Sequence, residues 1–330
     1  MTRRPVRWRR LLTYVVIAYG GAWLICLPLW LGQGLRTPHA KAWIVAMMFT
    51  PALAGLVTVL VWPDGRRIVD VLGLRPAAFR RWWWTLLVGW LGPPLLVTIA
   101  VGLAIAAGQF TIDWGTWSMF RTTLPNAPLP MPLSTLLLLT VASSVLANVW
   151  LAGAFAAGEE IGWRGFLRDE LSVLPRWALI LATGSIWGLW HAPIILLGYN
   201  YPHLPPVVAL ACMVVFTTLA AALLEWLRTV GTSIWPTALA HGAINTAGAL
   251  SLLLVPLSHP PSALTSGLLG WTGWLVMALT IGVLVLTGAL RLRARPCDEQ
   301  PVSSPRSGSV SARAGGAGPS PDPGGSAGRS

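Results

Sequence analysis

Long apolar stretches separated by short polar segments run along most of the chain. Eight of these stretches are long enough for a membrane-crossing helix, which needs about 20 residues. They cover residues 11–31, 42–62, 82–107, 133–158, 177–197, 206–227, 233–255 and 268–290. A bilayer offers no hydrogen-bond partner to open backbone groups, so each stretch is expected to be a helix. The pattern predicts an all-α fold, a polytopic membrane bundle of about eight transmembrane helices.

The composition agrees with this interpretation. Hydrophobic residues make up 55% of the chain and charged residues only 10%, whereas a soluble domain carries about 25% charged residues. Many of the 20 Trp residues lie at the edges of apolar stretches, where the indole ring suits the membrane interface. Membrane lipids are therefore the expected surroundings of this chain.

The formal net charge of +12 comes from Lys and Arg residues that are spread over short loops. Because they form no single patch, we reject a nucleic-acid partner. With the N-terminus placed in the cytoplasm, only Arg36, Lys41 and Arg121 of the 23 Lys and Arg residues fall in outside loops. Cytoplasmic loops are the ones enriched in Lys and Arg, so both termini are predicted to be cytoplasmic.

The chain divides into four predicted parts. Residues 1–132 hold the first three helices and an external loop, residues 133–255 hold the fourth to seventh helices, and residues 256–295 hold the last. Residues 296–330 are rich in Ser, Gly, Pro and Arg, a composition that cannot bury a core. We predict that they form a disordered cytoplasmic tail.

Two adjacent carboxylates, Glu159 and Glu160, follow the fourth stretch. A charge at the bilayer centre costs at least about 2.5–3.5 kcal/mol on insertion scales, so such groups face a partner or a cavity. Neighbours on a helix point about 100° apart. Glu160 can pair with Arg164 one turn later, which leaves Glu159 free to face another element. The alternative is an ion pair at the cytoplasmic end of the helix that has no role in chemistry.

Further polar residues interrupt the fifth and seventh stretches. His191 needs a hydrogen-bond partner inside an apolar helix, and Trp187 lies one turn earlier on the same face, where it could form the wall of a pocket. His241 and Asn245 share one helical face, and Gly242 between them permits close approach of another helix. The alternatives are a histidine that serves packing and a polar contact that holds helices together.

Taken together, these residues suit hydrolysis. His191 and His241 are the histidines that lie within apolar stretches. A carboxylate can take a proton from water, and an imidazole or a carboxamide can donate to a developing oxyanion. We expect Glu159, His191, His241 and Asn245 to line one cavity. By the charge distribution Glu159 lies at the cytoplasmic end of its stretch, so the cavity is expected to open toward the cytoplasm.

The same pattern resembles the CPBP family of intramembrane proteases, also called ABI or the CAAX prenyl endopeptidase and bacteriocin-processing family. The signature of that family reads EExxxR, then FxxxH, then HxxxN, and the resemblance covers about residues 133–255. The matching residues are Glu159, Glu160, Arg164, His191, His241 and Asn245. One departure is Trp187, which stands where the second motif has Phe and keeps an aromatic ring there.

The resemblance implies a glutamate-dependent intramembrane endopeptidase that needs no cofactor. By matching positions, Glu159 would activate the water with help from His191, and His241 and Asn245 would form the oxyanion hole. The second glutamate and the arginine of the first motif would be supporting members of the site. The expected substrate is a membrane-associated peptide or protein.

Two alternatives stay open. A zinc-dependent version of the protease could use Glu159, His191 and His241 as ligands, although the sequence lacks the HExxH motif of zincins. A non-enzymatic membrane protein, either a bacteriocin self-immunity factor or a transporter, also places polar residues inside a bundle. Carboxylates spread over the full membrane depth would favour transport, whereas convergence on one water would favour the protease.

The composition also suggests where the protein resides. Its richness in Arg, Ala, Gly and Trp is typical of a bacterium with a high-GC genome. We therefore expect a multi-pass protein of a bacterial plasma membrane.

Overall fold

The computed structural model describes residues 6–265 and 267–292, all of which belong to one compact unit. These residues form helices and connecting loops, and none of them forms a strand. The prediction of an all-α fold is therefore confirmed. The predicted tail, residues 296–330, lies outside the described residues.

The first three apolar stretches form long helices. They are α1 (Trp8–Leu31), the pair α2 (Ala40–Met47) and α3 (Thr50–Val61), and α5 (Phe79–Ala106). Short helical turns lie in the loops between and after them: η1 (Gly34–Arg36), α4 (Ile68–Val71) and α6 (Ser118–Arg121). The second stretch is divided because Pro51, in the first turn of α3, has no backbone N–H to continue the preceding helix.

The fourth stretch is longer than the predicted 133–158. It consists of α7 (Leu133–Ser143), the π-helical segment η2 (Ser144–Asn148), α8 (Val149–Glu160), the π-helical segment η3 (Ile161–Leu167) and α9 (Arg168–Glu170). Apolarity ends at Glu159, but the helix continues because Glu160 and Arg164 form an ion pair inside the protein. Glu159 therefore lies well within the helical segment and not at its end.

The remaining stretches form α10 (Arg176–Trp190) with α11 (Ala192–Ile195), α12 (Pro206–Gly231), α13 (Trp235–Leu252) and α14 (Trp271–Leu286). Five segments are long and apolar enough to cross a membrane: Trp8–Leu31, Ala40–Val61, Phe79–Ala106, Leu133–Glu170 and Pro206–Gly231. The chain is therefore a multi-pass membrane protein. Because α10, α13 and α14 are shorter or less apolar, the number of eight crossings stays a prediction.

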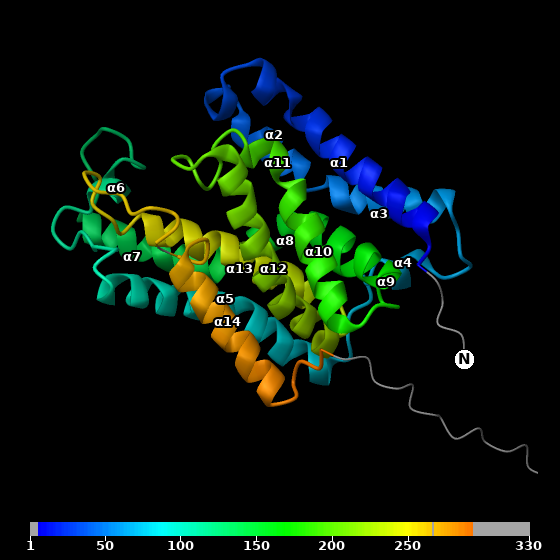
Figure 1. Ribbon diagram of the computed structural model, residues 1–330. Coiled ribbons are helices and arrows are strands. Elements are labelled where there is room, and N and C mark those ends of the chain that lie inside the picture. The colour runs from blue at the N-terminus through cyan, green and yellow to red at the C-terminus, as the bar shows by residue number, and fades with distance from the viewer. Residues whose placement is uncertain (1–5, 266, 293–330) are drawn as a thin grey trace, which may run out of the picture. The chain divides into compact units, whose positions relative to one another are not determined.

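The loops gather at two ends of this helical unit. The arginine-rich end holds residues 6–10, 62–78, 164–176, 228–234 and 290–292, and the opposite end holds residues 31–40, 107–132, 196–205 and 253–265 with 267–270. At the arginine-rich end, the backbone N–H of Ile234 donates to the Gly73 carbonyl at 3.1 Å. At the opposite end, the Tyr201 hydroxyl donates to the Leu269 carbonyl at 2.9 Å. Figure 1 shows α4 and α9 near one end and α6 near the other, so successive stretches run in alternating directions.

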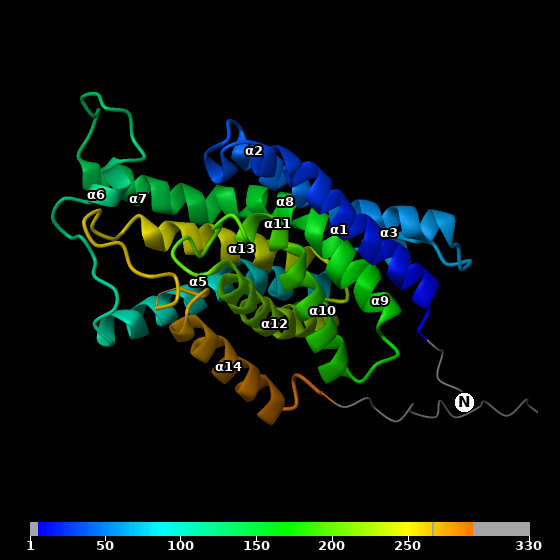
Figure 2. The same ribbon diagram turned by 45° about the horizontal axis from the view of Figure 1, so that its top comes forward.

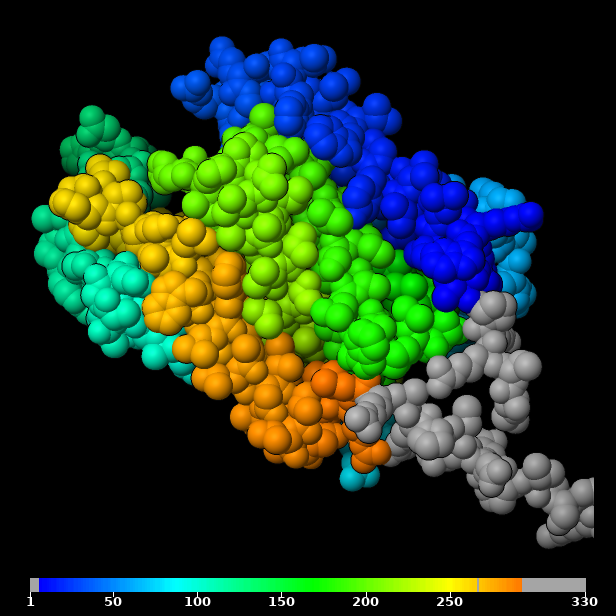
Figure 3. Space-filling view, in the orientation of Figure 1, coloured from blue at the N-terminus to red at the C-terminus, as the bar shows by residue number. Residues whose placement is uncertain are grey.

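Helix α13 lies at the centre of the packing, between α8 and α5 (Figure 2). Gly242 permits the contact with α8, since a Cβ atom at this position would come within 2.2 Å of the Gly153 backbone nitrogen. Helix α10 packs against α12, and α14 lies along α12 on the face that Figure 3 presents. This arrangement places the polar residues of α8, α10 and α13 beside one another.

Candidate active site

Glu159 is fixed by two tryptophan side chains. It is 3% exposed, and its Oε2 accepts a hydrogen bond of 2.7 Å from the indole N–H of Trp187 on α10. The indole N–H of Trp163, one turn along its own helix, makes a longer contact of 3.4 Å with the same oxygen. Among the described residues, the second oxygen, Oε1, has no hydrogen-bond partner. One oxygen is thus held in place while the other stays free.

Glu160 faces a different set of partners. Its Oε1 accepts from the Arg164 guanidinium at 2.9 Å and from His241 Nδ1 at 3.0 Å. The Arg164 guanidinium also lies 4.3 Å from the ring centroid of Trp187, a cation–π geometry. The pair that the sequence suggests between Glu160 and Arg164 is present, and it connects α13 to the helix that carries both glutamates.

His191 lies where α10 ends and α11 begins. Its Nδ1 lies 2.9 Å from the Trp187 carbonyl, and because a carbonyl can only accept, Nδ1 carries the proton. The other ring nitrogen, Nε2, is thus left for a partner in the cavity. The ring of Trp190 meets the His191 ring edge to face at 4.8 Å. Pro193, two residues later, supports the break because it cannot donate to the preceding turn.

His241 and Asn245 come from α13, one turn apart. The carboxylate of Glu160 accepts from His241 Nδ1, so Nε2 is the nitrogen of His241 that remains for another partner. Asn245 is exposed, and the part of the chain that the structure describes gives its carboxamide no hydrogen bond. Both side chains therefore keep polar groups that a substrate could use.

Glu159, His191, His241 and Asn245 line one cavity of about 380 Å³. The structure thus brings together four of the six residues that the sequence singles out. The other two, Glu160 and Arg164, do not line the cavity. Glu160 accepts a hydrogen bond from His241, and the Arg164 guanidinium lies over the Trp187 ring. The rest of the lining is largely apolar and comes from Ile44, Met47, Met48, Met213, Phe216 and Ile244, among others.

The cavity does not reach the arginine-rich end. Trp163, Phe166 and Leu167, which follow Glu159 toward that end, are fully buried. The lining extends instead to Tyr199 and Asn200, and to Ala263 and Gly267–Leu269, all at the opposite end. By the charge distribution the opposite end is predicted to face outward, so on the predicted orientation the cavity does not open toward the cytoplasm as expected. The difference arises because Glu159 lies about a third of the way back from the end of the helical stretch Leu133–Glu170 and not at its end.

The zinc alternative requires three ligands, Glu159, His191 and His241. Within residues 6–265 and 267–292, no three His, Cys, Asp or Glu side chains come together as a metal site requires. His241 Nδ1 is bonded to Glu160 and His191 Nδ1 to a carbonyl, which leaves Nε2 of both rings free, and metal-ligating histidines are held by bonds of this kind. The zinc-dependent version with Glu159, His191 and His241 therefore stays an alternative that experiment decides.

Sequence reasoning missed three residues of the site and the role of a fourth. Trp163 donates to Glu159 from four residues along the same helix, a spacing visible in the sequence. Trp187 is identified as a pocket wall, but its role as hydrogen-bond donor to Glu159 is not. Met47 and Met48 line the cavity from outside the predicted core of residues 133–255, and nothing in their local sequence indicates this.

Part of the chain matches a known protein-family model. Residues 136–247 match the family described as "Type II CAAX prenyl endopeptidase Rce1-like". The matched range contains every residue of the three motifs, so the resemblance to CAAX-type intramembrane proteases is confirmed. A comparison with curated proteins finds no match.

Proposed function

We propose, from the Rce1-like match over residues 136–247, that this membrane protein is an intramembrane endopeptidase. It hydrolyses a peptide bond of a membrane-associated peptide or protein, with a water molecule activated by Glu159. The observation that carries the proposal is the free Oε1 of Glu159 in a cavity that it shares with His191, His241 and Asn245. We propose a bacterial plasma membrane as its location.

In the first step, Glu159 acts as the general base. Its free oxygen takes a proton from a water in the cavity, and the water oxygen attacks the carbonyl carbon of the peptide bond. The Trp187 N–H holds the other carboxylate oxygen at 2.7 Å, which fixes the base against the water. His191 assists through Nε2, the nitrogen that it has free for that water.

In the second step, negative charge develops on the former carbonyl oxygen. The Asn245 carboxamide donates to this oxygen, and His241 donates through Nε2 when its ring carries a second proton, with Glu160 as its counter-ion. Donors aimed at developing charge are typically the largest contribution to catalysis. The tetrahedral intermediate then collapses, the bond to nitrogen breaks, and the leaving amine receives the proton that Glu159 took from water.

The distribution of carboxylates argues against the transporter alternative. Of the other acidic residues that the structure describes, Asp64, Asp70, Asp169 and Glu170 pair with Arg side chains at the arginine-rich end. Glu225 pairs with Arg168 nearby. Asp113, in a loop of the opposite end, accepts hydrogen bonds from Thr116 and Ser118. The acidic groups therefore form no series through the depth of the bundle, whereas transport paths are lined by such groups.

Replacement of the base tests the proposal. Glu159→Gln keeps the size of the side chain and removes its ability to take a proton, so cleavage should fall about 10²–10⁴-fold. The measurement uses purified protein in proteoliposomes and a library of apolar peptides with quenched fluorophores. Asp70→Asn, the same chemical change at an exposed carboxylate, is the control. Equal cleavage by Glu159→Gln and the unmodified protein would refute the role of Glu159.

The same assay decides the question of the metal. If His241 and Asn245 hold the oxyanion, activity survives exhaustive treatment with a zinc chelator. Loss of activity with stoichiometric loss of zinc, and its recovery when zinc is added back, would establish the zinc-dependent version instead.

A further inference from the structure

We infer that the cavity receives its substrate from the extracytoplasmic side of the membrane, as an uncharged, apolar segment of a membrane-associated peptide. The inference rests on the proposed hydrolytic function and specifies its substrate. It combines two independent observations: which end of the helical unit carries the Arg residues, and which end the cavity reaches.

Arg residues mark one end of the unit. In the described residues, the loops of the opposite end carry only Arg36, Lys41 and Arg121, while every other Arg lies at or next to the arginine-rich end. Orientation in a membrane follows the count of Lys and Arg in short loops, and Asp and Glu contribute little to it. The arginine-rich end is therefore the cytoplasmic end, and the opposite end faces outward.

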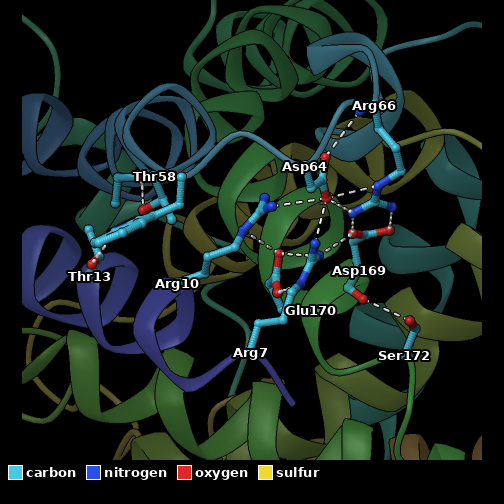
Figure 4. A network of polar contacts seen from close by, with 11 residues as sticks. Arg7, Arg10, Thr13, Thr58, Asp64, Arg66, Asp169, Glu170 and Ser172 are labelled. Carbon is cyan, nitrogen blue, oxygen red and sulfur yellow. Dashed lines mark hydrogen bonds and ion pairs between the residues drawn. The ribbon is translucent and has the colours of Figure 1, made fainter. Parts of the chain in front are cut away.

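Acidic partners at the arginine-rich end do not change this assignment. Figure 4 shows Arg7, Arg10 and Arg66 around Asp64, with Glu170 and Asp169 beside them. Arg7 bonds Glu170 at 2.7 Å and Asp64 at 2.5 Å. The carboxylates connect the segments of the arginine-rich end. The Arg residues nevertheless oppose transfer of these segments across the bilayer.

The cytoplasmic end of the site is closed by packed side chains. Tyr14 stacks on Phe166 with ring centroids 4.8 Å apart and meets Trp163 edge to face. All three rings are fully buried. Further toward the arginine-rich end, Arg10 and Glu170 are also buried, at 4% and 3% exposed. A peptide in the cytoplasm therefore finds no path along α8 to Glu159.

The opposite end of the site is open. The cavity continues from Glu159 past His191 to Tyr199 and Asn200, which are partly exposed, and to the loop that holds Leu269. Asn245, halfway along α13, is itself exposed. A segment that enters from this side meets the proposed oxyanion donor first and Glu159 at the deepest point.

The lining defines the chemistry of the segment that fits. Among the described residues that line the cavity, Glu159 is the one Asp, Glu, Lys or Arg, and Met47, Met48 and Met213 are among the apolar ones. Charged side chains are costly in such surroundings, and Met adapts to apolar groups of different shape. The occupant is thus an uncharged apolar segment.

Two exposed serines give a matched test of orientation. Ser258 lies at the opposite end and Ser172 at the arginine-rich end, and neither lines the cavity. After replacement of Cys26, Cys212 and Cys297, one cysteine is introduced as Ser258→Cys or Ser172→Cys. A membrane-impermeant maleimide should label Ser258→Cys in intact cells, and Ser172→Cys only after permeabilisation. The reverse pattern overturns the inference.

Two reporters then test the substrate. The same apolar peptide segment is placed on the extracytoplasmic or the cytoplasmic side of a single-span anchor, and both are expressed with the protein or with Glu159→Gln. Glu159-dependent cleavage of the extracytoplasmic reporter alone is expected, and a Lys in its centre should reduce cleavage at least about tenfold. Cleavage of the cytoplasmic reporter alone overturns the inference. If neither is cleaved while Ser258→Cys is labelled from outside, the hydrolytic function fails and the orientation stands.

Discussion

One oxygen of Glu159 carries the hydrogen bonds, and the other has no hydrogen-bond partner among the described residues. The donor at 2.7 Å is Trp187, at the position where the resembling family's second motif has Phe, which has no N–H to give. The same indole lies against the Arg164 guanidinium and the His241 ring. Trp187 therefore joins both glutamates of the first motif into one rigid arrangement, although it does not touch the reacting atoms in the proposed mechanism. We regard it as a positioning residue.

Removal of the indole N–H should slow turnover and leave substrate binding unchanged. Trp187→Phe keeps an aromatic ring but deprives Glu159 of its short hydrogen bond, and bonds to charged groups contribute about 1.5–3 kcal/mol. We expect kcat to fall about ten- to a hundredfold with KM unchanged. Steady-state kinetics with a peptide whose cleavage is lost in Glu159→Gln will measure both parameters.

Trp190→Phe is the matched control for this substitution. Trp190 is on the same helix, is buried, and donates to Thr50 at 3.1 Å instead of to a carboxylate. Its substitution should change kcat much less than Trp187→Phe does. Equal losses from both variants would mean that ring packing, and not the hydrogen bond to Glu159, is what matters.

The two adjacent glutamates should differ in their effect on stability. Glu160 is fully buried and compensates the charge of Arg164, which is itself 3% exposed. Removing one partner of a buried ion pair costs about 3–5 kcal/mol. We expect Glu160→Gln to lower the unfolding temperature in detergent markedly, while Glu159→Gln stays close to the unmodified protein and loses activity. If Glu159→Gln is the less stable variant, the roles are reversed.

Elements far apart in the sequence meet at the arginine-rich end. Arg10 on α1 lies between Asp64, in the loop before α4, and Glu170 at the end of α9, at 2.9 and 3.0 Å. Burial alone would raise the pKa of Asp64, but the hydrogen bonds from Arg66 and Arg7 outweigh it and hold this pKa well below its usual range. The ionised carboxylate is thus part of what holds α1 against the helical stretch that carries Glu159.

The pH dependence of stability should reveal this contact. Because the folded pKa of Asp64 is depressed, its contribution is fully present above the unfolded pKa of about 3.9 and is lost as the pH falls toward the folded value. The difference in unfolding temperature between the unmodified protein and Asp64→Asn should be constant from about pH 5 to 8 and shrink below about pH 4. Asp70→Asn, at an exposed pair with Arg75, should show little effect at any pH. A difference for Asp64→Asn that grows in acid would contradict this account.

Hydropathy and motif spacing predict much of the molecule, and the limits of the prediction have physical causes. All eight apolar stretches contain helices, because lipid and packed neighbours both demand satisfied backbone groups. The end of the fourth stretch is missed because a hydropathy pattern treats Glu160 and Arg164 as polar, whereas in the folded protein they form a buried pair. The side on which the cavity opens, and its walls from α2, depend on contacts between segments more than a hundred residues apart. Such contacts cannot be predicted from the residues that neighbour each position in the sequence.

The predicted tail provides the last test, since it concerns the chain as a whole. Residues 296–330 contain no His, and their carboxylates are limited to Asp298, Glu299 and Asp322. Every residue of the proposed site precedes them, so they should be dispensable for hydrolysis. A truncation after Arg295 keeps Arg291, Arg293 and Arg295, the positive charges that hold the last helix in its orientation.

This truncated protein should insert with Ser258 still accessible from outside, and it should cleave the reporter at a rate within about twofold of the full chain. Fluorescence of a cytoplasmic reporter fused after Arg295, together with the peptide assay, measures both properties. Full insertion with loss of cleavage would show that the tail contributes to the site. The cavity opens at the end away from Arg291, and the buried side chains of Trp163 and Phe166 lie between Glu159 and the arginine-rich end. The tail therefore has no direct path to the site, and we expect cleavage to persist without it.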